Sequence, residues 1–194
     1  MVRRFTAPLL LIAAYVLAAC GGSHSGGFGQ AGAFQPIPLG DGLAITGAVL
    51  PRDTIGVGYP DQVGHVFSKT WKTDVAGFTQ THYSQTLAFP PGTQITITSI
   101  SKGSEYHTFN VIAKRSAPPA RFPSNPKLLM TPSGGHKLVV GYRSGVLTPG
   151  KSVHVTLVKG IYLIGCAFHY KSDNMRDVVV VADGAKPGPT ATPP

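Results

Sequence analysis

Hydrophobic and polar residues alternate along several short runs of this chain. The alternation is strict over residues 94–100 and 152–158, and a strand with one buried face gives this period of two. Residues 177–182 contain four consecutive valines, which is typical of a strand buried on both faces. Further strand-like runs lie at residues 43–49, 84–89, 106–113, 136–142 and 161–165.

These runs predict seven or eight short strands joined by turns. Glycine (24) and proline (17) are abundant, and long amphipathic helical patterns are scarce. The predicted fold is therefore all-β, an antiparallel Greek-key β-sandwich. Residues 116–135 interrupt the pattern with five prolines, and we expect a short helix inside them at residues 127–130. Residues 51–80 are expected to form strand pieces and loops.

The two ends of the chain lack the composition of a folded domain. Residues 1–19 have a basic start and a short apolar run, typical of a secretory signal and shorter than the roughly 20 residues that a membrane span needs. The run Leu-Ala-Ala-Cys that ends at Cys20 resembles the lipobox of bacterial lipoproteins. We therefore expect a lipidated Cys20 with a flexible tether at 20–40, the β-sandwich at 41–183 and a disordered tail at 184–194.

The lipobox resemblance implies a location as well as a modification. In bacterial lipoproteins the chain is cut before the cysteine, whose sulfur then carries lipid. This chain would be exported across the inner membrane and anchored in the cell envelope, on the periplasmic face or the outer surface. The alternative is ordinary secretion, in which Cys20 has no special role.

The charge of the chain is strongly positive but not concentrated. The formal net charge is +9 with histidines neutral, and it falls to +7 if Arg3 and Arg4 leave with the signal. No run of Lys or Arg is longer than a pair, and aromatic and basic residues do not interleave, so nucleic-acid binding is not expected. The charge indicates either a diffusely solvated surface or attraction to anionic partners.

The chain has two cysteines, Cys20 and Cys166. If Cys20 is acylated, Cys166 is the only thiol of the mature domain and has no cysteine to pair with. A lone thiol in an oxidising compartment is a liability unless it is buried or bound to metal. Taken alone, Cys166 fits both of those interpretations equally well.

A constellation of side chains favours the metal. Cys166, His169 and Met175 lie within ten residues, directly after a strand-like run, and His107 lies on an earlier one. One cysteine, two histidines and one methionine are the ligands that hold a single copper ion in a blue electron-transfer site. The sequence therefore predicts a metal site formed by His107, Cys166, His169 and Met175.

The same residues carry a resemblance to a known family. The motif Gly-x-Tyr-x-x-x-Cys-x-x-His followed by Met, with residues 104–111 as a first-histidine strand, resembles the cupredoxins, the family of plastocyanin and the azurin-like proteins. The resemblance covers roughly residues 84–182. It implies one mononuclear type 1 copper, an electron carrier that is not an enzyme, and redox protein partners. We also expect a monomer, and the positive charge of the chain favours acidic partners. The resemblance also implies a partner-docking patch around His169 that includes Phe168 and Tyr170.

Three features depart from the family pattern. Five residues separate His169 from Met175, where plastocyanins commonly have four. The family often has Asn where this chain has Thr108, and Ser or Thr where it has Ala167. In the family those two positions tie the ligand strands together by a hydrogen bond. Because Ala167 has no polar side chain, we expect a different arrangement around the ligands here.

Other functions remain open. A multicopper oxidase places histidines on both sides of the cysteine, whereas Gly165 and Ala167 stand there in this chain, so catalysis is not expected. A copper-binding or storage protein, or a metal-free cupredoxin-like interaction lipoprotein, is the alternative to a carrier. The remaining candidate ligands are interpreted as surface histidines or, for the methionine, as packing: His65, His82, His136, His154 and Met130. His24 lies in the predicted tether.

Overall fold

The computed structural model describes residues 35–38, 44–47, 50–58, 66–68, 71, 73–75, 77–79, 87–101, 103–117 and 121–186. The chain divides into two compact units, Met1–Gln30 and Ala31–Pro194, and all described residues belong to the second. The expected signal, Cys20 and residues 187–194 of the expected tail lie outside the described residues, so their assignments stay predictions.

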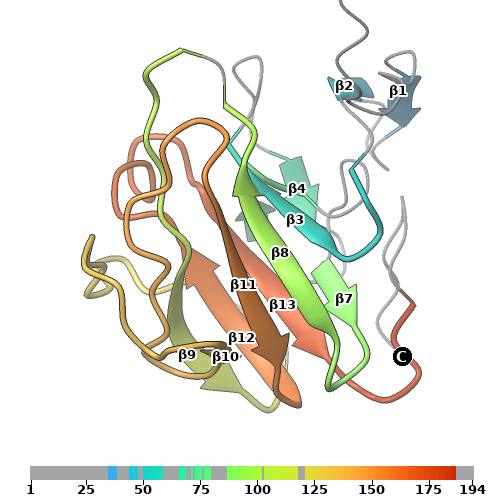
Figure 1. Ribbon diagram of the computed structural model, residues 1–194. Helices are drawn as coiled ribbons and strands as arrows, with labels where there is room; N and C mark the ends of the chain where they lie inside the picture. The colour runs from blue at the N-terminus through green and yellow to red at the C-terminus, as the bar shows by residue number, and fades with distance from the viewer. Residues whose placement is uncertain are drawn as a thin grey trace, which may run out of the picture. The chain divides into compact units, whose positions relative to one another are not determined.

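The described residues form short strands connected by turns and loops (Figure 1). The first strands are β1 (Gln35–Pro38), β2 (Ala44–Gly47), β3 (Thr54–Val57), β4 (Val66–Ser68), β5 (Thr73–Val75), β6 (Phe78–Thr79) and β7 (Leu87–Phe89). The remaining strands are β8 (Gln94–Ser99), β9 (Asn110–Arg115), β10 (Lys137–Leu138), β11 (Ser152–Leu157), β12 (Gly160–Gly165) and β13 (Arg176–Val181).

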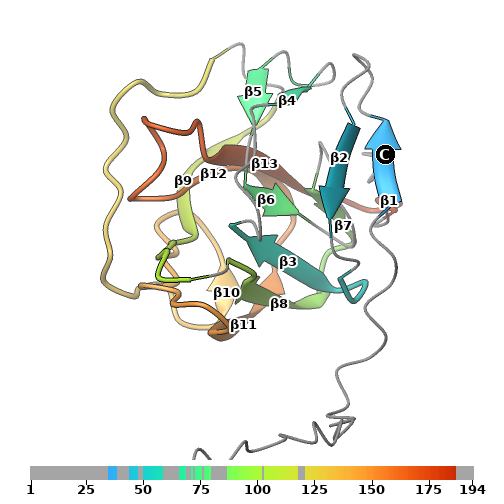
Figure 2. The same cartoon turned by 90° about the horizontal axis from the view of Figure 1, so that it is seen from above.

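Two sheets make up the body of the fold. One has the strand order β10-β11-β8-β3-β6 and the other β7-β13-β12-β9, while β1-β2 and β4-β5 form separate two-stranded pairs. Figures 1 and 2 show β8 and β11 in one layer and β12 and β13 in the other. The prediction of an all-β sandwich is therefore confirmed. The pairing is mixed, because β3–β8, β10–β11 and β7–β13 are parallel while the other pairs are antiparallel.

The alternating runs face the core as their pattern predicts. In β8, every second residue is buried, and Ile95 and Ile97 lie in the main hydrophobic cluster between the sheets. In β13, Val179 and Val181 join that cluster, whereas Val178 and Val180 pack into a second cluster on the outer face of the same sheet. The expectation that this valine strand is buried on both faces is confirmed, and each buried valine contributes about 1.5–3 kcal/mol of transfer free energy.

Two local predictions are wrong. The strand expected at residues 136–142 is limited to Lys137–Leu138, because the chain turns at once: the N–H of Tyr142 donates to the carbonyl of Val139, and Gly141 has a positive φ of 82°. Residues 127–130 form no helix, since a single turn between Pro126 and Pro132 has too few hydrogen bonds to persist. No helix among the described residues is long and apolar enough to cross a membrane.

Candidate metal centre

Backbone hydrogen bonds bring His107 to one end of the sandwich. Its N–H donates to the carbonyl of Leu147 over 3.1 Å, and its carbonyl accepts from the N–H of Leu147 over 2.8 Å. This isolated bridge stands just before β9, which pairs with β12 in antiparallel register. Because β9 starts where β12 ends, His107 arrives beside Cys166, the residue that follows β12.

The loop from Cys166 to Met175 is closed by its own backbone. The N–H of Cys166 donates to the carbonyl of Met175 over 3.0 Å, and the N–H of Met175 donates to the carbonyl of His169 over 3.1 Å. Asn174 has a φ of 47°, a left-handed conformation that asparagine tolerates better than most residues. The tight turn accommodates the five residues between His169 and Met175, and it folds His169 back over Cys166.

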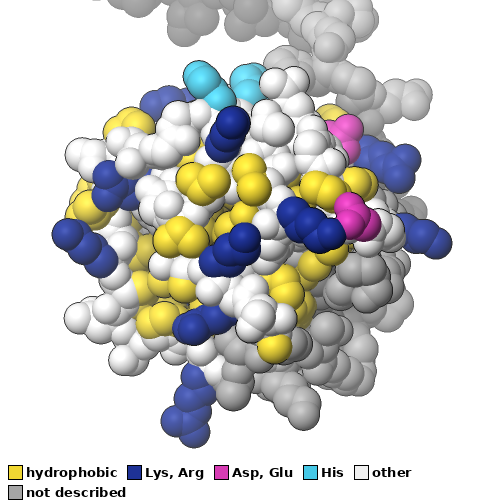
Figure 3. All heavy atoms as spheres, turned by 90° about the horizontal axis from the view of Figure 1, so that it is seen from below, with side chains coloured by type: hydrophobic (Ala, Val, Ile, Leu, Met, Phe, Trp, Pro, Cys, Tyr) yellow, Lys and Arg dark blue, Asp and Glu magenta, His cyan; other side chains and the backbone are white. Residues whose placement is uncertain are grey.

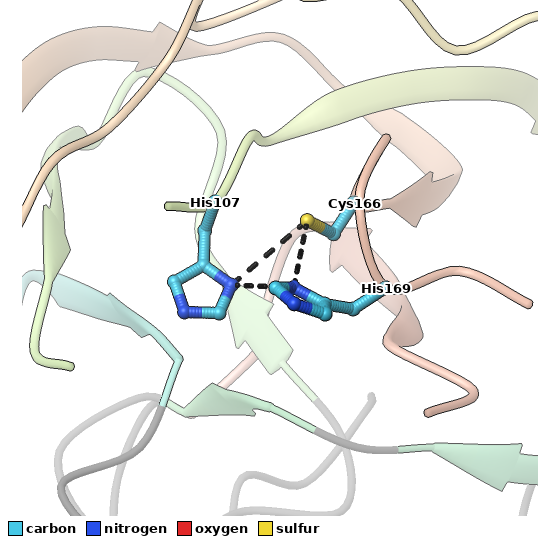
Figure 4. Close-up of side chains that lie close together, drawn as sticks. All are labelled: His107, Cys166 and His169. Carbon is cyan, nitrogen blue, oxygen red and sulfur yellow. Dashed lines mark hydrogen bonds between the residues drawn. The ribbon is translucent and has the colours of Figure 1, made fainter. Parts of the chain in front are cut away.

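Three donor atoms converge at this end of the fold, as Figure 4 shows. The Sγ of Cys166 lies 3.9 Å from Nδ1 of His107 and 3.8 Å from Nδ1 of His169, and the two Nδ1 atoms are 3.2 Å apart. His107 and Cys166 are buried, whereas His169 is half-buried. Among the described residues this is the one group of at least three histidine, cysteine or acidic side chains arranged to hold a metal ion.

The size of this triangle fits a first-row transition metal. A triangle with sides of 3.2, 3.8 and 3.9 Å has its corners about 2.1 Å from a common point. Metal–nitrogen and metal–sulfur bonds measure roughly 2.0–2.1 and 2.3 Å for zinc, a comparable ion. Two imidazoles and one thiolate in a trigonal set match copper in an electron-transfer site. The donor set therefore fits copper, with His107, Cys166 and His169 as the residues that would hold it.

The far nitrogen of His107 is fixed by Ser101. Its Nε2 lies 2.6 Å from Oγ of Ser101, and both side chains are buried. In the tautomer in which Nε2 donates this hydrogen bond, Nδ1 directs its lone pair at Cys166 and His169. Gly58, with a φ of 84°, makes room for the pair, because a Cβ there would lie 2.1 Å from Oγ of Ser101. Neither Ser101 nor Gly58 could be identified from the sequence, since neither belongs to a motif.

The thiol of Cys166 is held ready to lose its proton. Burial alone raises its pKa, but side-chain hydrogen bonding with His107 and His169 and the backbone N–H of Thr108, 3.4 Å from Sγ, lower it from 9.0 to about 6. In turn, the hydrogen bond with Cys166 raises the pKa of His169 against the opposing effect of burial. The site thus stabilises a thiolate, which is the form that binds metal.

A hydrogen bond joins the two ligand-bearing segments despite the alanine. The backbone N–H of Ala167 donates to Oγ1 of Thr108 over 2.8 Å, and Nδ2 of Asn110 donates to the same oxygen over 2.7 Å. Thr108 is fully buried. The link that the family makes between these positions is therefore made here with a backbone donor from Ala167, in place of a side chain.

Met175 follows Cys166 and His169 closely in the chain and is part of the main core. Its side chain is buried, and it contacts Gly77, where a Cβ would lie 3.3 Å from the Met175 sulfur. Its carbonyl accepts the hydrogen bond from Cys166, which fixes its backbone at the site. Its role as a fourth, axial ligand stays a prediction.

The expected docking patch needs one correction. Phe168 is 37% exposed beside His169, as expected for a surface contact. Tyr170 is 4% exposed: its hydroxyl donates to the carbonyl of Pro123 over 2.6 Å, and its ring packs in the second core cluster. The prediction that Tyr170 lines a docking surface is wrong, because its side chain is buried in a cluster that includes Phe122 of the proline-rich segment.

The other candidate residues are not brought to the site. His136 and His154 are exposed, as predicted, and Nδ1 of His154 lies 3.1 Å from Oγ1 of Thr96 on the neighbouring strand. Met130 is 53% exposed, so the interpretation of its side chain as packing is wrong. His24, His65 and His82 lie outside the described residues.

Comparison with known proteins found solved structures of similar fold. The chain is similar to a novel purple cupredoxin from Nitrosopumilus maritimus, with 18% sequence identity and a TM-score of 0.37 over 66% of this chain and 98% of that chain. It is also similar to sodium-dithionite-reduced auracyanin from the photosynthetic bacterium Roseiflexus castenholzii, with 19% identity and a TM-score of 0.30 over 50% and 84% of the two chains. No family model and no curated protein matches the chain.

The β-sandwich and its His-Cys-His site agree with the cupredoxin resemblance seen in the sequence. The chain forms a β-sandwich, and His107, Cys166 and His169 meet at one end of it. At these sequence identities the similarity to solved structures concerns the fold alone. What this chain does with the site therefore has to be argued from its own side chains.

Proposed function

We propose that this protein is a type 1 copper electron carrier that shuttles single electrons between redox partners in the cell envelope. The observation that supports this most directly is the convergence of Nδ1 of His107, Nδ1 of His169 and Sγ of Cys166 within 4.8 Å of one another. When bound, copper supplies a one-electron couple between Cu(I), which prefers sulfur, and Cu(II), which prefers nitrogen ligands.

The protein's own contribution is to hold the three ligands still. The bridge between His107 and Leu147 and the closed loop of Cys166 fix both backbone segments, and Thr108 links them. Ser101 fixes the ring of His107. A site whose ligands are locked by packing and by hydrogen bonds moves little when the charge at its centre changes, and this is what fast electron exchange requires.

Electrons would enter and leave beside His169. His107 and Cys166 are buried, whereas His169 is half-buried and has the exposed ring of Phe168 next to it, with ring centroids 6.2 Å apart. A redox partner would dock on this part of the surface. Changing Phe168 to Glu should slow electron exchange with such a partner, and unchanged exchange would rule out docking at Phe168.

A carrier fits the site better than an enzyme. Gly165 and Ala167 flank the cysteine and offer no side chain that would bridge to a further metal. The three ligands leave the centre buried under His169, without a second cluster of metal-ligating side chains among the described residues. We therefore propose that this protein is a monomer, that it holds one copper ion, and that it does not bind nucleic acid.

Membrane attachment is a separate part of the proposal. Residues 17–20 match a lipobox, so we expect Cys20 to carry lipid and to anchor the domain in the cell envelope. The mass of the purified native chain should show cleavage before Cys20 and added lipid. A Cys20→Ser variant should be absent from the membrane fraction. A native chain whose Cys20 carries no lipid, or a Cys20→Ser variant that stays in the membrane fraction, would rule out the anchor.

Reversible one-electron cycling tests the carrier directly. The copper-loaded protein should be titrated with mediators against a reference electrode while its visible absorbance is followed. For a carrier, the absorbance plotted against potential fits a single one-electron transition, and the curve measured on reoxidation coincides with the curve measured on reduction. Copper that is lost on reduction, or a pale and weakly bound Cu(II) form, would instead support copper storage. The Cys166→Ala variant provides the matched control.

A further inference from the structure

The two ends of the sandwich differ in charge. The metal end carries His107, Cys166 and His169. At the opposite end, strand termini and turns carry six exposed cations: Arg52, Lys114, Arg115, Lys137, Lys159 and Lys186. We call this surface the basic end.

Strand register places these cations together. Arg115 pairs with Ile161 near the start of β12, and Lys159 directly precedes that strand. The ligand Cys166 follows the opposite end of the same strand. Lys137 pairs with Thr156 near the end of β11. Arg52 precedes β3, whose first residue pairs with Thr96 near the start of β8. These register positions lie at the edge of the sheets remote from the metal ligands, where the connection between β11 and β12 lies at the bottom of Figure 1.

Few acidic groups offset the cations of the basic end. Asp53 and Asp183 are the exposed acids there among the described residues, and Asp183 forms an ion pair with Lys159. Six cations therefore stand against two anions. Around the metal ligands, exposed Lys151, Lys171 and Arg121 stand against exposed Glu105 and Asp173, and Arg143 and Arg176 there are half-buried. The exposed cations are therefore more numerous at the basic end than around the metal ligands.

Apolar side chains are interspersed with the cations. Figure 3 views the molecule from below and shows Lys and Arg side chains spread over this face, with hydrophobic side chains between them. Val158, 37% exposed at the end of β11, and Pro90, exposed after β7, belong to it. Spread cations with exposed apolar residues are the combination that binds the headgroup region of a membrane with anionic lipids.

We propose that the basic end docks on an anionic lipid membrane. A redox partner is a poorer match for this surface, because a partner seated there would be separated from the half-buried His169 by the length of the sandwich. A membrane needs no electron path. Docked in this way, the domain holds its metal end away from the lipid and open to partners. The interaction depends on surface charge and not on copper, so it can be tested apart from the proposed electron transfer.

The expected strength follows from membrane electrostatics. Each lysine or arginine near an anionic leaflet contributes roughly 1 kcal/mol, which corresponds to about a fivefold change in affinity. Removing two such charges from the basic end should therefore weaken binding about 25-fold. Because the attraction falls off within a Debye length of about 8–10 Å, binding should also weaken as salt is added.

Vesicle binding by the full chain without copper provides the test. Partitioning should be compared between vesicles of phosphatidylcholine alone and vesicles that also contain phosphatidylglycerol. The test variant is Arg115→Gln with Lys137→Gln, and the matched control is Lys151→Gln with Lys171→Gln at the metal end. Each pair removes two positive charges from exposed positions, so net charge and the N-terminal segment are identical in the two proteins.

The proposal predicts tighter binding to the anionic vesicles, a loss of about 25-fold in the test variant and little change in the control. Equal losses in the two variants would show that net charge alone matters, and would overturn a specific basic end. Equal binding to the two kinds of vesicle would overturn the membrane as the partner and leave an acidic protein as the alternative. Circular dichroism of both variants checks that they are folded.

Discussion

Thr108 offers the sharpest test of how the two ligand segments are held together. Its Oγ1 accepts hydrogen bonds from the N–H of Ala167 and from Nδ2 of Asn110. Thr108→Val keeps the shape of the side chain and removes the acceptor. Asn110 is buried, so its Nδ2 loses its partner without access to water, while Ala167 is half-buried and loses less. A buried unpaired donor costs about 1–3 kcal/mol, so we expect a total of about 2–4 kcal/mol.

The assay is urea unfolding of the metal-free chain followed by circular dichroism. The midpoint should fall with little change in slope. Thr108→Ser restores the oxygen and should recover most of the loss, apart from about 1 kcal/mol for the missing methyl group. Thr156→Val on β11, a half-buried threonine away from the site, should change stability by less than about 0.5 kcal/mol.

Two outcomes would refute the reasoning. If Thr108→Val lies within about 0.5 kcal/mol of the unmodified chain, the hydrogen bonds through Oγ1 do not stabilise the fold. If the serine variant is as unstable as the valine variant, the oxygen is not the cause. Copper affinity gives a second measure: the valine variant should bind the ion about 10–100-fold more weakly, because a support of the ligand loop is lost.

Three further changes test the rest of the site. Ser101→Ala removes the partner of His107 Nε2 and should weaken copper binding about 10–100-fold in a competition titration; unchanged affinity would show that the ring needs no such support. Gly58→Ala should destabilise the chain by more than the roughly 1–2 kcal/mol of a left-handed alanine, because its Cβ would also meet Ser101; a melting curve like that of the unmodified chain would contradict this. In the metal-free chain the thiolate of Cys166, followed by ultraviolet absorbance, should titrate near pH 6 and not near 9.0. Since the folded pKa is the lower one, this thiol's contribution to stability is complete above pH 9.0 and is lost as the pH falls through about 6; a thiol titration midpoint near 9 would refute it.

The parts of the fold that follow from local pattern could be predicted from the sequence. Alternation at residues 94–100 and 152–158 gave β8 and β11, because a half-buried strand imposes that period on its own residues. The four consecutive valines of β13 predicted a strand buried on both faces, and the structure has one there. The pairing of Cys166 with His169 also followed, since their spacing within one loop is a local feature, whereas the place of His107, 59 residues before Cys166, was predicted only through the family resemblance.

What failed depends on contacts between distant segments. The burial of Tyr170 depends on Pro123, whose carbonyl accepts from its hydroxyl, and on Phe122, which shares its core cluster, and nothing near Tyr170 in the sequence records these contacts. The pairing of Ser101 with His107 is likewise set by the close approach of Gly58. The run at residues 136–142 has a strand-like composition, but tertiary structure turns it after two residues.

Titration of the metal-free chain with Cu(II), compared with its Cys166→Ala variant, tests the central claim most directly. A thiolate bound to Cu(II) gives an intense visible charge-transfer band, which should rise and saturate at one copper per chain. The variant should lack the band and bind the ion far more weakly, because it loses one of the three converging donors. If the variant binds copper equally tightly with the same spectrum, the ion is not held by Cys166, and the proposed metal centre is wrong.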